Sequence, residues 1–167
     1  MYWYVVHVKL NHNPKIIQLF NNLDDVSAFI PKIEKWYNVK SIKDYVIKEV
    51  YPNYIFLKSP LNKKEFKDKY GTLFKTISGL VDLLDYDDVY VLKQEEQILM
   101  EKLFNGEDTI RRSVGNIVNS QLVVESGPLL NLENLVIKID RHHRIATLQT
   151  HLFNKKIQVP LEVVHKS

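Results

Sequence analysis

The chain has 167 residues, enough for one ordinary domain or for a domain of about 110 residues followed by a small one of about 50. Charged residues make up 26%, and no run of eighteen uncharged apolar residues occurs that could cross a membrane. No charged-then-apolar leader opens the sequence, so we expect a soluble, unprocessed protein of the cytoplasm. The absence of cysteine excludes disulfides and thiolate metal sites and fits a reducing compartment.

The positive charge is concentrated near the C-terminus. Residues 1–110 hold 15 Lys and Arg against 16 Asp and Glu, a net charge of −1. Residues 111–167 hold 8 against 4, a net charge of +4, together with four of the six histidines. A polyanion would be attracted to this last third by long-range electrostatics, although a merely solvated basic surface would have the same composition.

Strand and helix signals alternate at the start of the chain. Trp3 to Lys9 is rich in aromatic and β-branched residues and predicts a central strand. With Asn13 as N-cap and Pro14 at the first helical position, the apolar spacing that follows predicts a short amphipathic helix. Residues 28–36 favour extended structure again, and the polar residues 39–44 predict a mobile hairpin loop.

The segment Tyr51-Pro52-Asn53-Tyr54 is a turn between two apolar strands. Its aromatic residues could form a surface for a partner, or they could belong to a bulge in a buried sheet. Residues 62–70 predict a helix that ends before Gly71, and the apolar stretch from Leu73 predicts a strand and a turn.

An acidic loop holds Asp85, Asp87 and Asp88, but it lacks the glycine and the terminal Glu of an EF-hand. After it, residues 98–104 have the spacing of an amphipathic helix. Asn105-Gly106 would end that helix.

The last third has the pattern of a small β structure. Residues 107–118, with Arg111-Arg112 and Gly115, predict a linker. Short β-rich segments then follow one another at close spacing, separated by Gly-Pro, Arg-His-His-Arg and Asn-Lys-Lys turns. Such a succession is typical of a small barrel.

Several of these motifs, in this order, resemble the NusG family of transcription elongation factors. They are WYVVHVK, FIPK and VYPNYIFLK in the first half and SGPLLNLEN, VIKIDRHHR and LFNKK in the second. The ending KIDRHHR is most similar to the LoaP subfamily of specialised NusG paralogues. The resemblance implies an α+β protein with a NusG-like N-terminal α/β sandwich domain (1–106), a linker (107–118) and a C-terminal KOW β-barrel (119–167).

Asparagine replaces family glycines at Asn53, Asn134 and Asn154. Because asparagine tolerates positive φ better than most residues, we expect the turns at these positions to survive. The change at Asn134 puts in doubt a close approach of RNA to the backbone there.

For the first half, the resemblance implies a domain that grips the clamp helices of bacterial RNA polymerase and holds the clamp closed. Tyr51, Pro52 and Tyr54 match the motif that lines the polymerase-facing pocket, although both tyrosines could instead be core residues. Lys9, His12 and Lys15 sit where family members place polar residues that face non-template DNA.

For the second half, the resemblance implies an antiterminator that binds a hairpin in leader RNA. The candidate RNA-binding residues are Lys138, Arg141, His142, His143 and Arg144, with Lys155 and Lys156 in the next turn. If both turns fall at one end of the barrel, these residues form a compact cationic patch for phosphates. The alternatives are a solvated turn or a protein-binding surface.

We therefore expect an operon-specific factor for transcription elongation and antitermination that acts as a monomer. A general NusG-type elongation factor that recruits proteins through its barrel, and a ribosomal or RNA-chaperone KOW protein, remain open. No phosphate loop, nucleophile elbow or paired acid and base occurs, so we expect neither an enzyme nor a cofactor. We expect no zinc at His142, His143 and His151, which lack cysteine and a convincing acidic partner.

Overall fold

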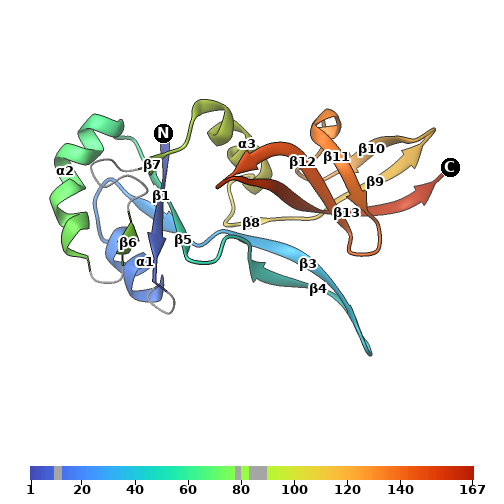
Figure 1. Cartoon of the computed structure of the whole chain (residues 1–167), viewed down its shortest axis with the longest axis horizontal. Coiled ribbons are helices and arrows are strands. Elements are labelled where there is room, and N and C mark those ends of the chain that lie inside the picture. Colours follow the sequence, from blue (N-terminus) through green and yellow to red (C-terminus); the bar gives the residue numbers. More distant parts are fainter. Residues whose placement is uncertain (10–12, 78–79, 83–89) are drawn as a thin grey trace. The chain divides into compact units, whose positions relative to one another are not determined.

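The chain divides into two compact units, which we describe separately. The structure is a computed structural model that describes residues 1–9, 13–77, 80–82 and 90–167 (Figure 1). The first unit comprises residues 1–31 and 51–98, and the second comprises residues 32–50 and 99–167. A segment from the first third of the sequence is therefore part of the same unit as the C-terminal strands. No helix among the described residues is both long and apolar enough to cross a membrane.

The first unit is built on a five-stranded sheet. Its strand order is β2-β5-β1-β6, and β7 also pairs with β1. The elements are β1 (Tyr2–Val8), α1 (Asn13–Asn21), β2 (Ser27–Phe29), β5 (Tyr54–Ser59), α2 (Lys63–Thr76), β6 (Leu80–Asp82) and β7 (Tyr90–Val91), with the first residues of α3 (Gln94–Phe104). The predicted first strand and first helix are confirmed, and the mixed α/β class is that of the structure.

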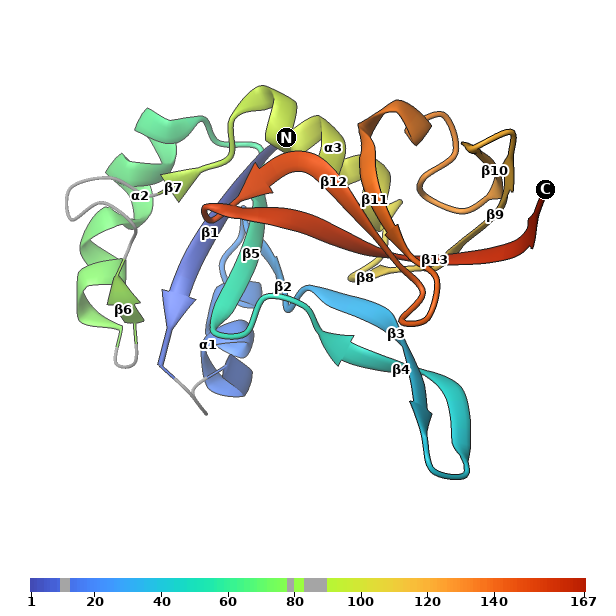
Figure 2. The same cartoon turned by 45° about the vertical axis from the view of Figure 1, so that its right-hand side comes forward.

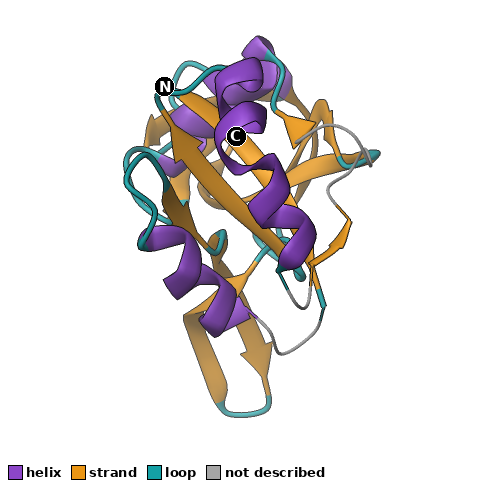
Figure 3. Ribbon diagram, turned by 90° about the vertical axis from the view of Figure 1, so that its left-hand side faces the viewer, coloured by secondary structure: helices purple, strands orange, loops and turns teal. Residues whose placement is uncertain are grey.

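The helices α1 and α2 lie beside the sheet of the first unit (Figures 1 and 3). Their buried aromatic residues belong to the same core cluster as Tyr4, Val6 and Val8, which alternate along β1. Tyr4 stacks on Phe66 of α2 with ring centroids 4.1 Å apart, and Phe20 of α1 meets Phe74 edge to face at 5.3 Å. All four side chains are buried. Burial of each aromatic side chain contributes about 1.5–3 kcal/mol, so this cluster accounts for much of the unit's stability.

Helix α2 is longer than predicted, because it continues through Gly71 to Thr76 instead of ending before the glycine. A capping box in which Asn62 and Glu65 exchange hydrogen bonds begins the helix. Phe66, Tyr70 and Phe74 recur every four residues and are all buried. Their burial outweighs the cost of about 1 kcal/mol for a glycine inside a helix.

Two strands form a hairpin in the second unit. The hairpin comprises β3 (Lys32–Val39) and β4 (Ile42–Glu49), and β8 (Thr109–Ile110) pairs in parallel with the start of β3. The expected polar loop at 39–44 is reduced to Lys40 and Ser41, since the two strands pair as far as Val39 and Ile42. Lys40 has a φ of 54°, a left-handed conformation that closes the two-residue turn.

A five-stranded sheet of order β10-β9-β13-β12-β11 makes up most of the second unit. Its strands are β9 (Ser113–Val118), β10 (Gln121–Ser126), β11 (Val136–Asp140), β12 (Ile145–Leu152) and β13 (Lys155–Lys166), with the 3-10 turn η1 (Glu133–Leu135). The first half of β13 pairs antiparallel with β12, and its second half pairs in parallel with β9. In the residues that the structure describes, no pairing joins β10 to β11, so these strands are the sheet edges.

The expected linker at 107–118 contains β8 and the whole of β9. Gly115 lies within a strand and not in a linker. It lets β9 approach β10, because an added Cβ would lie 2.5 Å from the Val123 carbonyl oxygen. Gly127 fits the predicted Gly-Pro turn, because its φ is 98° and a Cβ at this position would clash with Ser113.

Asn53 and Asn154 have the positive φ expected of them, 69° and 61°. Asn134 does not, since it lies in η1, and it is Asn131 of the same loop that is left-handed, with a φ of 66°. His12 and the acidic loop from Asp85 to Asp88 lie outside the described residues.

The aromatic cluster provides a test of the first unit. Replacing Phe66 with Ala should lower the free energy of unfolding by about 3–5 kcal/mol, because it removes the ring that contacts Tyr4, Tyr70 and Phe74. Chemical denaturation measures the change, and the exposed Lys64→Ala of the same helix is the control. A loss below about 1 kcal/mol for Phe66→Ala would contradict this packing.

Candidate functional site

The basic turn between β11 and β12 is held by the residue that precedes it. The Asp140 carboxylate accepts a hydrogen bond from the backbone N–H of His143 at 3.0 Å and contacts the His143 Nδ1 at 2.8 Å. These bonds, the backbone one first, lower the pKa of Asp140. Arg141, His142 and His143 are exposed, so the turn presents one permanent positive charge and two imidazoles to solvent.

Arg144, the last residue of this turn, has a different environment. Its guanidinium lies 3.7 Å from the centre of the Trp36 ring of β3 and donates a hydrogen bond to the Tyr45 hydroxyl of β4 at 2.9 Å. It also pairs with Glu162 of β13 at 3.2 Å. Arg144 therefore connects the C-terminal sheet to the β3–β4 hairpin, and its charge is already shared with a carboxylate.

A second arginine reinforces this connection. The guanidinium of Arg112 lies 4.3 Å from the centre of the Tyr45 ring and 3.9 Å from Glu162. The Tyr45 hydroxyl also donates to the Glu162 carboxylate at 3.3 Å. Two arginines thus share one carboxylate and two aromatic rings. We call the five residues Trp36, Tyr45, Arg112, Arg144 and Glu162 the hairpin anchor.

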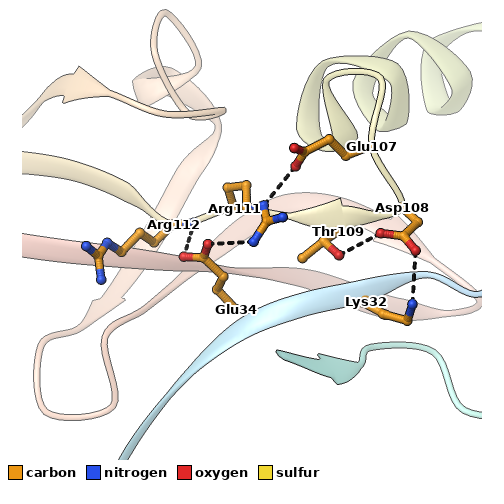
Figure 4. Close-up of polar contacts among 7 residues, drawn as sticks. All are labelled: Lys32, Glu34, Glu107, Asp108, Thr109, Arg111 and Arg112. Atoms are coloured by element: carbon orange, nitrogen blue, oxygen red, sulfur yellow. Dashed lines mark hydrogen bonds and ion pairs between the residues drawn. The ribbon is translucent and has the colours of Figure 1, made fainter. Parts of the chain in front are cut away.

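Next to the anchor, ion pairs tie the start of β3 to the segment between α3 and β9 (Figure 4). Glu34 accepts hydrogen bonds from the Arg111 guanidinium at 3.1 Å and from the backbone N–H of Arg112 at 3.2 Å. Arg111 also donates to Glu107 at 2.8 Å, and its pKa is raised by the bonds to Glu107 and Glu34.

At the first residue of β3, Lys32 donates to Asp108 at 2.9 Å and thereby lowers the pKa of Asp108. Thr109 donates a second hydrogen bond to the same carboxylate at 2.8 Å. The base of the hairpin is therefore fixed by charge-assisted hydrogen bonds as well as by strand pairing.

The remaining candidate RNA-binding residues do not form a single patch with the turn. Lys138 is exposed on β11, opposite Thr147, whereas Lys155 and Lys156 are exposed at the start of β13, opposite Leu152 and His151. The Arg-His-His-Arg turn precedes β12 and the Asn-Lys-Lys turn follows it. The two turns therefore lie at opposite ends of an eight-residue strand, about 25 Å apart for extended chain.

The candidate polymerase-binding residues occupy the turn before β5. Tyr51 stacks on Phe56 at 5.9 Å, and burial of its hydroxyl raises its pKa. Tyr54 is half-buried and stacks on His7 of β1 at 4.9 Å, while Pro52 is exposed. Tyr51 is thus mainly a packing residue, and Pro52 and the ring of Tyr54 are the accessible part of the motif.

The other candidates lie apart. Lys9 and Lys15 are exposed, at the end of β1 and in the first turns of α1, and His12 falls outside the described residues. His151 is exposed on β12. Throughout the described ranges, no group of three or more His, Asp or Glu side chains is placed to hold a metal ion.

The hairpin anchor is the feature that sequence reasoning missed. Trp36 and Tyr45 are directly opposite each other across the hairpin. Once a two-residue turn at Lys40-Ser41 is recognised, that register follows from the sequence. No signal in the sequence pairs these rings with Arg112 or Arg144, which is 99 positions from Tyr45.

The first part of the chain matches a known protein family. Residues 1–102 match the family model NusG, described as transcription termination factor nusG. The match covers more than half of the 167 residues and ends within α3. No curated protein sequence matches the chain.

The anchor can be tested by substitution at Arg144. Arg144→Ala should lower the free energy of unfolding of the second unit by about 1–2 kcal/mol, because it removes the ring contact and a charge-assisted hydrogen bond. Arg144→Lys should recover only part of this loss, since an ammonium group cannot stack as a planar guanidinium does. Chemical denaturation measures both, and Arg141→Ala in the same turn is the control. Equal effects of the two alanine substitutions would show that Arg144 does not anchor the hairpin.

Proposed function

This chain belongs to the NusG family, and from that premise we propose that it travels with bacterial RNA polymerase and promotes readthrough of terminators in selected operons. NusG family proteins bind RNA polymerase, so the kind of partner follows from the family. The observation that supports selection of operons through RNA is the exposed basic turn from Arg141 to His143, which Asp140 holds in place. No chemical step is part of this function.

Polymerase binding through the clamp helices is assigned to the turn before β5. Pro52 is exposed, and the half-buried ring of Tyr54 rests on His7, which orients it. An aromatic ring that is already oriented loses little conformational entropy when a partner covers it, which suits an interface anchor. A contact of this kind keeps the clamp closed only if it is stronger in the elongating state of the polymerase than in the paused state.

Tyr54→Ala should weaken binding to RNA polymerase by about 2 kcal/mol, a thirtyfold change in Kd, because it removes the aromatic ring that the polymerase would cover. Pull-down with core polymerase and a titration by biolayer interferometry measure the loss. Tyr2→Ala, which removes an aromatic ring that is 42% exposed on the same sheet, is the matched control. Unchanged affinity in a folded Tyr54→Ala variant would place the polymerase contact elsewhere.

For the C-terminal unit we propose a KOW barrel that binds the hairpin of a leader RNA. The sharing of β13 between β12 and β9 supports this proposal, because one long strand joins the two halves of the sheet. Side chains of directly opposed residues share a face, so Lys138, Thr147 and Gln158 form one row across β11, β12 and β13. His151 and Lys156 form a second row toward the other end of β12.

These two rows lie on the sheet between the two basic turns, which are at opposite ends of β12. RNA lying along β12 would meet Arg141, His142 and His143 at one end and Lys155 and Lys156 at the other. A double helix is recognised mainly through its shape and backbone, which suits cations spaced along a surface without stacking residues. Arg144 contributes to this site by fixing the turn and not by binding phosphate, because its guanidinium is held by the anchor.

Arg141→Glu and Lys156→Glu should each weaken binding of a leader RNA hairpin and lower the slope of log K against log salt by about one, if each side chain neutralises a phosphate. Gel-shift titrations at several salt concentrations measure both quantities. Lys64→Glu, exposed on α2, is the control for net charge. An unchanged salt slope in both test variants would show that RNA does not bind to this face.

A second candidate function is that of a general elongation factor whose C-terminal sheet recruits proteins. Exposed aliphatic side chains on that sheet favour it. They are Val118, Val123, Ile137 and Val164, which are 43–49% exposed. Such side chains suit a protein partner better than a nucleic acid.

A further inference from the structure

The two faces of the β3–β4 hairpin have different environments. Side chains alternate along a strand, so Trp36 and Tyr45 lie on one face, which the anchor packs against the C-terminal sheet. The opposite face, which we call the open face, consists of Lys35, Tyr37 and Val39 from β3 and Ile42, Val46 and Lys48 from β4, with Asp44 beside Tyr37. The hairpin extends beyond the C-terminal sheet, so the elements of its own unit leave the tip uncovered (Figure 2).

Large apolar side chains are exposed on the open face. Val39 is 56% exposed, Ile42 61% and Val46 41%. Val39 and Ile42 face each other next to the turn, adjacent to Tyr37. An exposed apolar strip of this kind marks a surface that contacts another molecule.

Two lysines accompany the aromatic ring of the open face. The ammonium of Lys48 lies 4.6 Å from the centre of the Tyr37 ring and that of Lys35 lies 5.8 Å from it. Both are exposed, and neither forms an ion pair with a carboxylate within the described ranges. The oxygen Oδ1 of Asp44 accepts a hydrogen bond from the N–H of Tyr45. The open face therefore combines an aromatic ring, aliphatic surface and two lysines that have no ion-pair partner in the part of the chain that the structure describes.

We propose that the open face binds a single strand of nucleic acid. One base stacks on Tyr37 in place of a lysine ammonium, a neighbouring base contacts Val39 and Ile42, and Lys35 and Lys48 then reach the flanking phosphates. Proteins that bind single strands combine aromatic stacking with cations along the backbone in this way. A duplex fits less well, because its bases are stacked on one another and cannot reach the ring.

The positive charge argues for nucleic acid over a protein segment. Lys40 in the turn adds to the charge of Lys35 and Lys48, against Asp44 on the same face. The site needs neither polymerase binding nor recognition of RNA by the C-terminal sheet, so it can be tested separately from both. The strand could be RNA or DNA, since both offer bases and phosphates.

The test is fluorescence anisotropy with the full-length protein and three labelled probes of about ten nucleotides: single-stranded RNA, single-stranded DNA of the same sequence, and a blunt RNA duplex. The variants are Tyr37→Leu, which keeps apolar bulk but removes the ring, and Lys35→Gln combined with Lys48→Gln. The matched control combines Lys64→Gln with Lys75→Gln, which removes the same charge from exposed positions of α2.

Tyr37→Leu should weaken binding of single strands about tenfold and leave duplex binding unchanged, because only an unpaired base stacks on the ring. The double lysine variant should weaken single-strand binding and flatten its salt dependence more than the α2 control does. A preference for the RNA or the DNA probe would identify the type of strand.

Wild-type affinity of Tyr37→Leu for both single strands would overturn the proposal. So would an equal loss of single-strand and duplex binding, or no measurable binding of single strands by the native protein. Loss of polymerase binding in Tyr37→Leu, with single-strand binding unchanged, would also overturn it and would assign the open face to a protein.

Discussion

The contact of Arg144 with Trp36, Tyr45 and Glu162 determines how the second unit is put together. The Arg144 guanidinium contacts the Trp36 ring, the Tyr45 hydroxyl and the Glu162 carboxylate at the same time. Arg112 supplies a second cation to the Tyr45 ring and to the same carboxylate. Side-chain exposure of 27% for Arg144 and 28% for Glu162 reduces solvent screening without burying either charge. A hairpin from the first third of the chain is thereby joined to the C-terminal strands.

This arrangement divides the cations of the basic turn by role. Arg144 is used for structure, whereas Arg141, His142 and His143 remain exposed at the same turn. The two faces of the hairpin differ in the same way. The face with Trp36 and Tyr45 packs against the two arginines, whereas the open face with Tyr37 does not. A protein that acts on a transcribing polymerase meets duplex, single-stranded and structured nucleic acid. The proposed sites differ accordingly, with cations spaced along β12 for a folded RNA and an aromatic ring between lysines for a single strand.

Local signals allowed most elements to be predicted, and long-range contacts explain the differences. The first strand, the helix ended by Asn105-Gly106 and the turn at Asn53 follow from composition, capping and backbone preference. The sequence predicts a helix end before Gly71 because the local cost of a glycine can be read from it. The packing of Phe74, which outweighs that cost, cannot. Similarly, the sequence identifies the basic residues near 141 as candidates for RNA binding. Their separation from Lys155 cannot be read from it, because that depends on β12 lying between the two turns. The role of Arg144 depends on residues about a hundred positions away.

We propose that this NusG family protein acts on transcribing polymerase and recognises its operon through RNA. In vitro transcription through a terminator measures this directly, on one template that encodes the native leader and on a second whose leader hairpin is disrupted, each with and without the protein. We expect the protein to increase readthrough on the first template only, and compensatory changes that restore the hairpin to restore readthrough. Equal readthrough on both templates would contradict recognition through RNA, and unchanged termination on both would contradict antitermination.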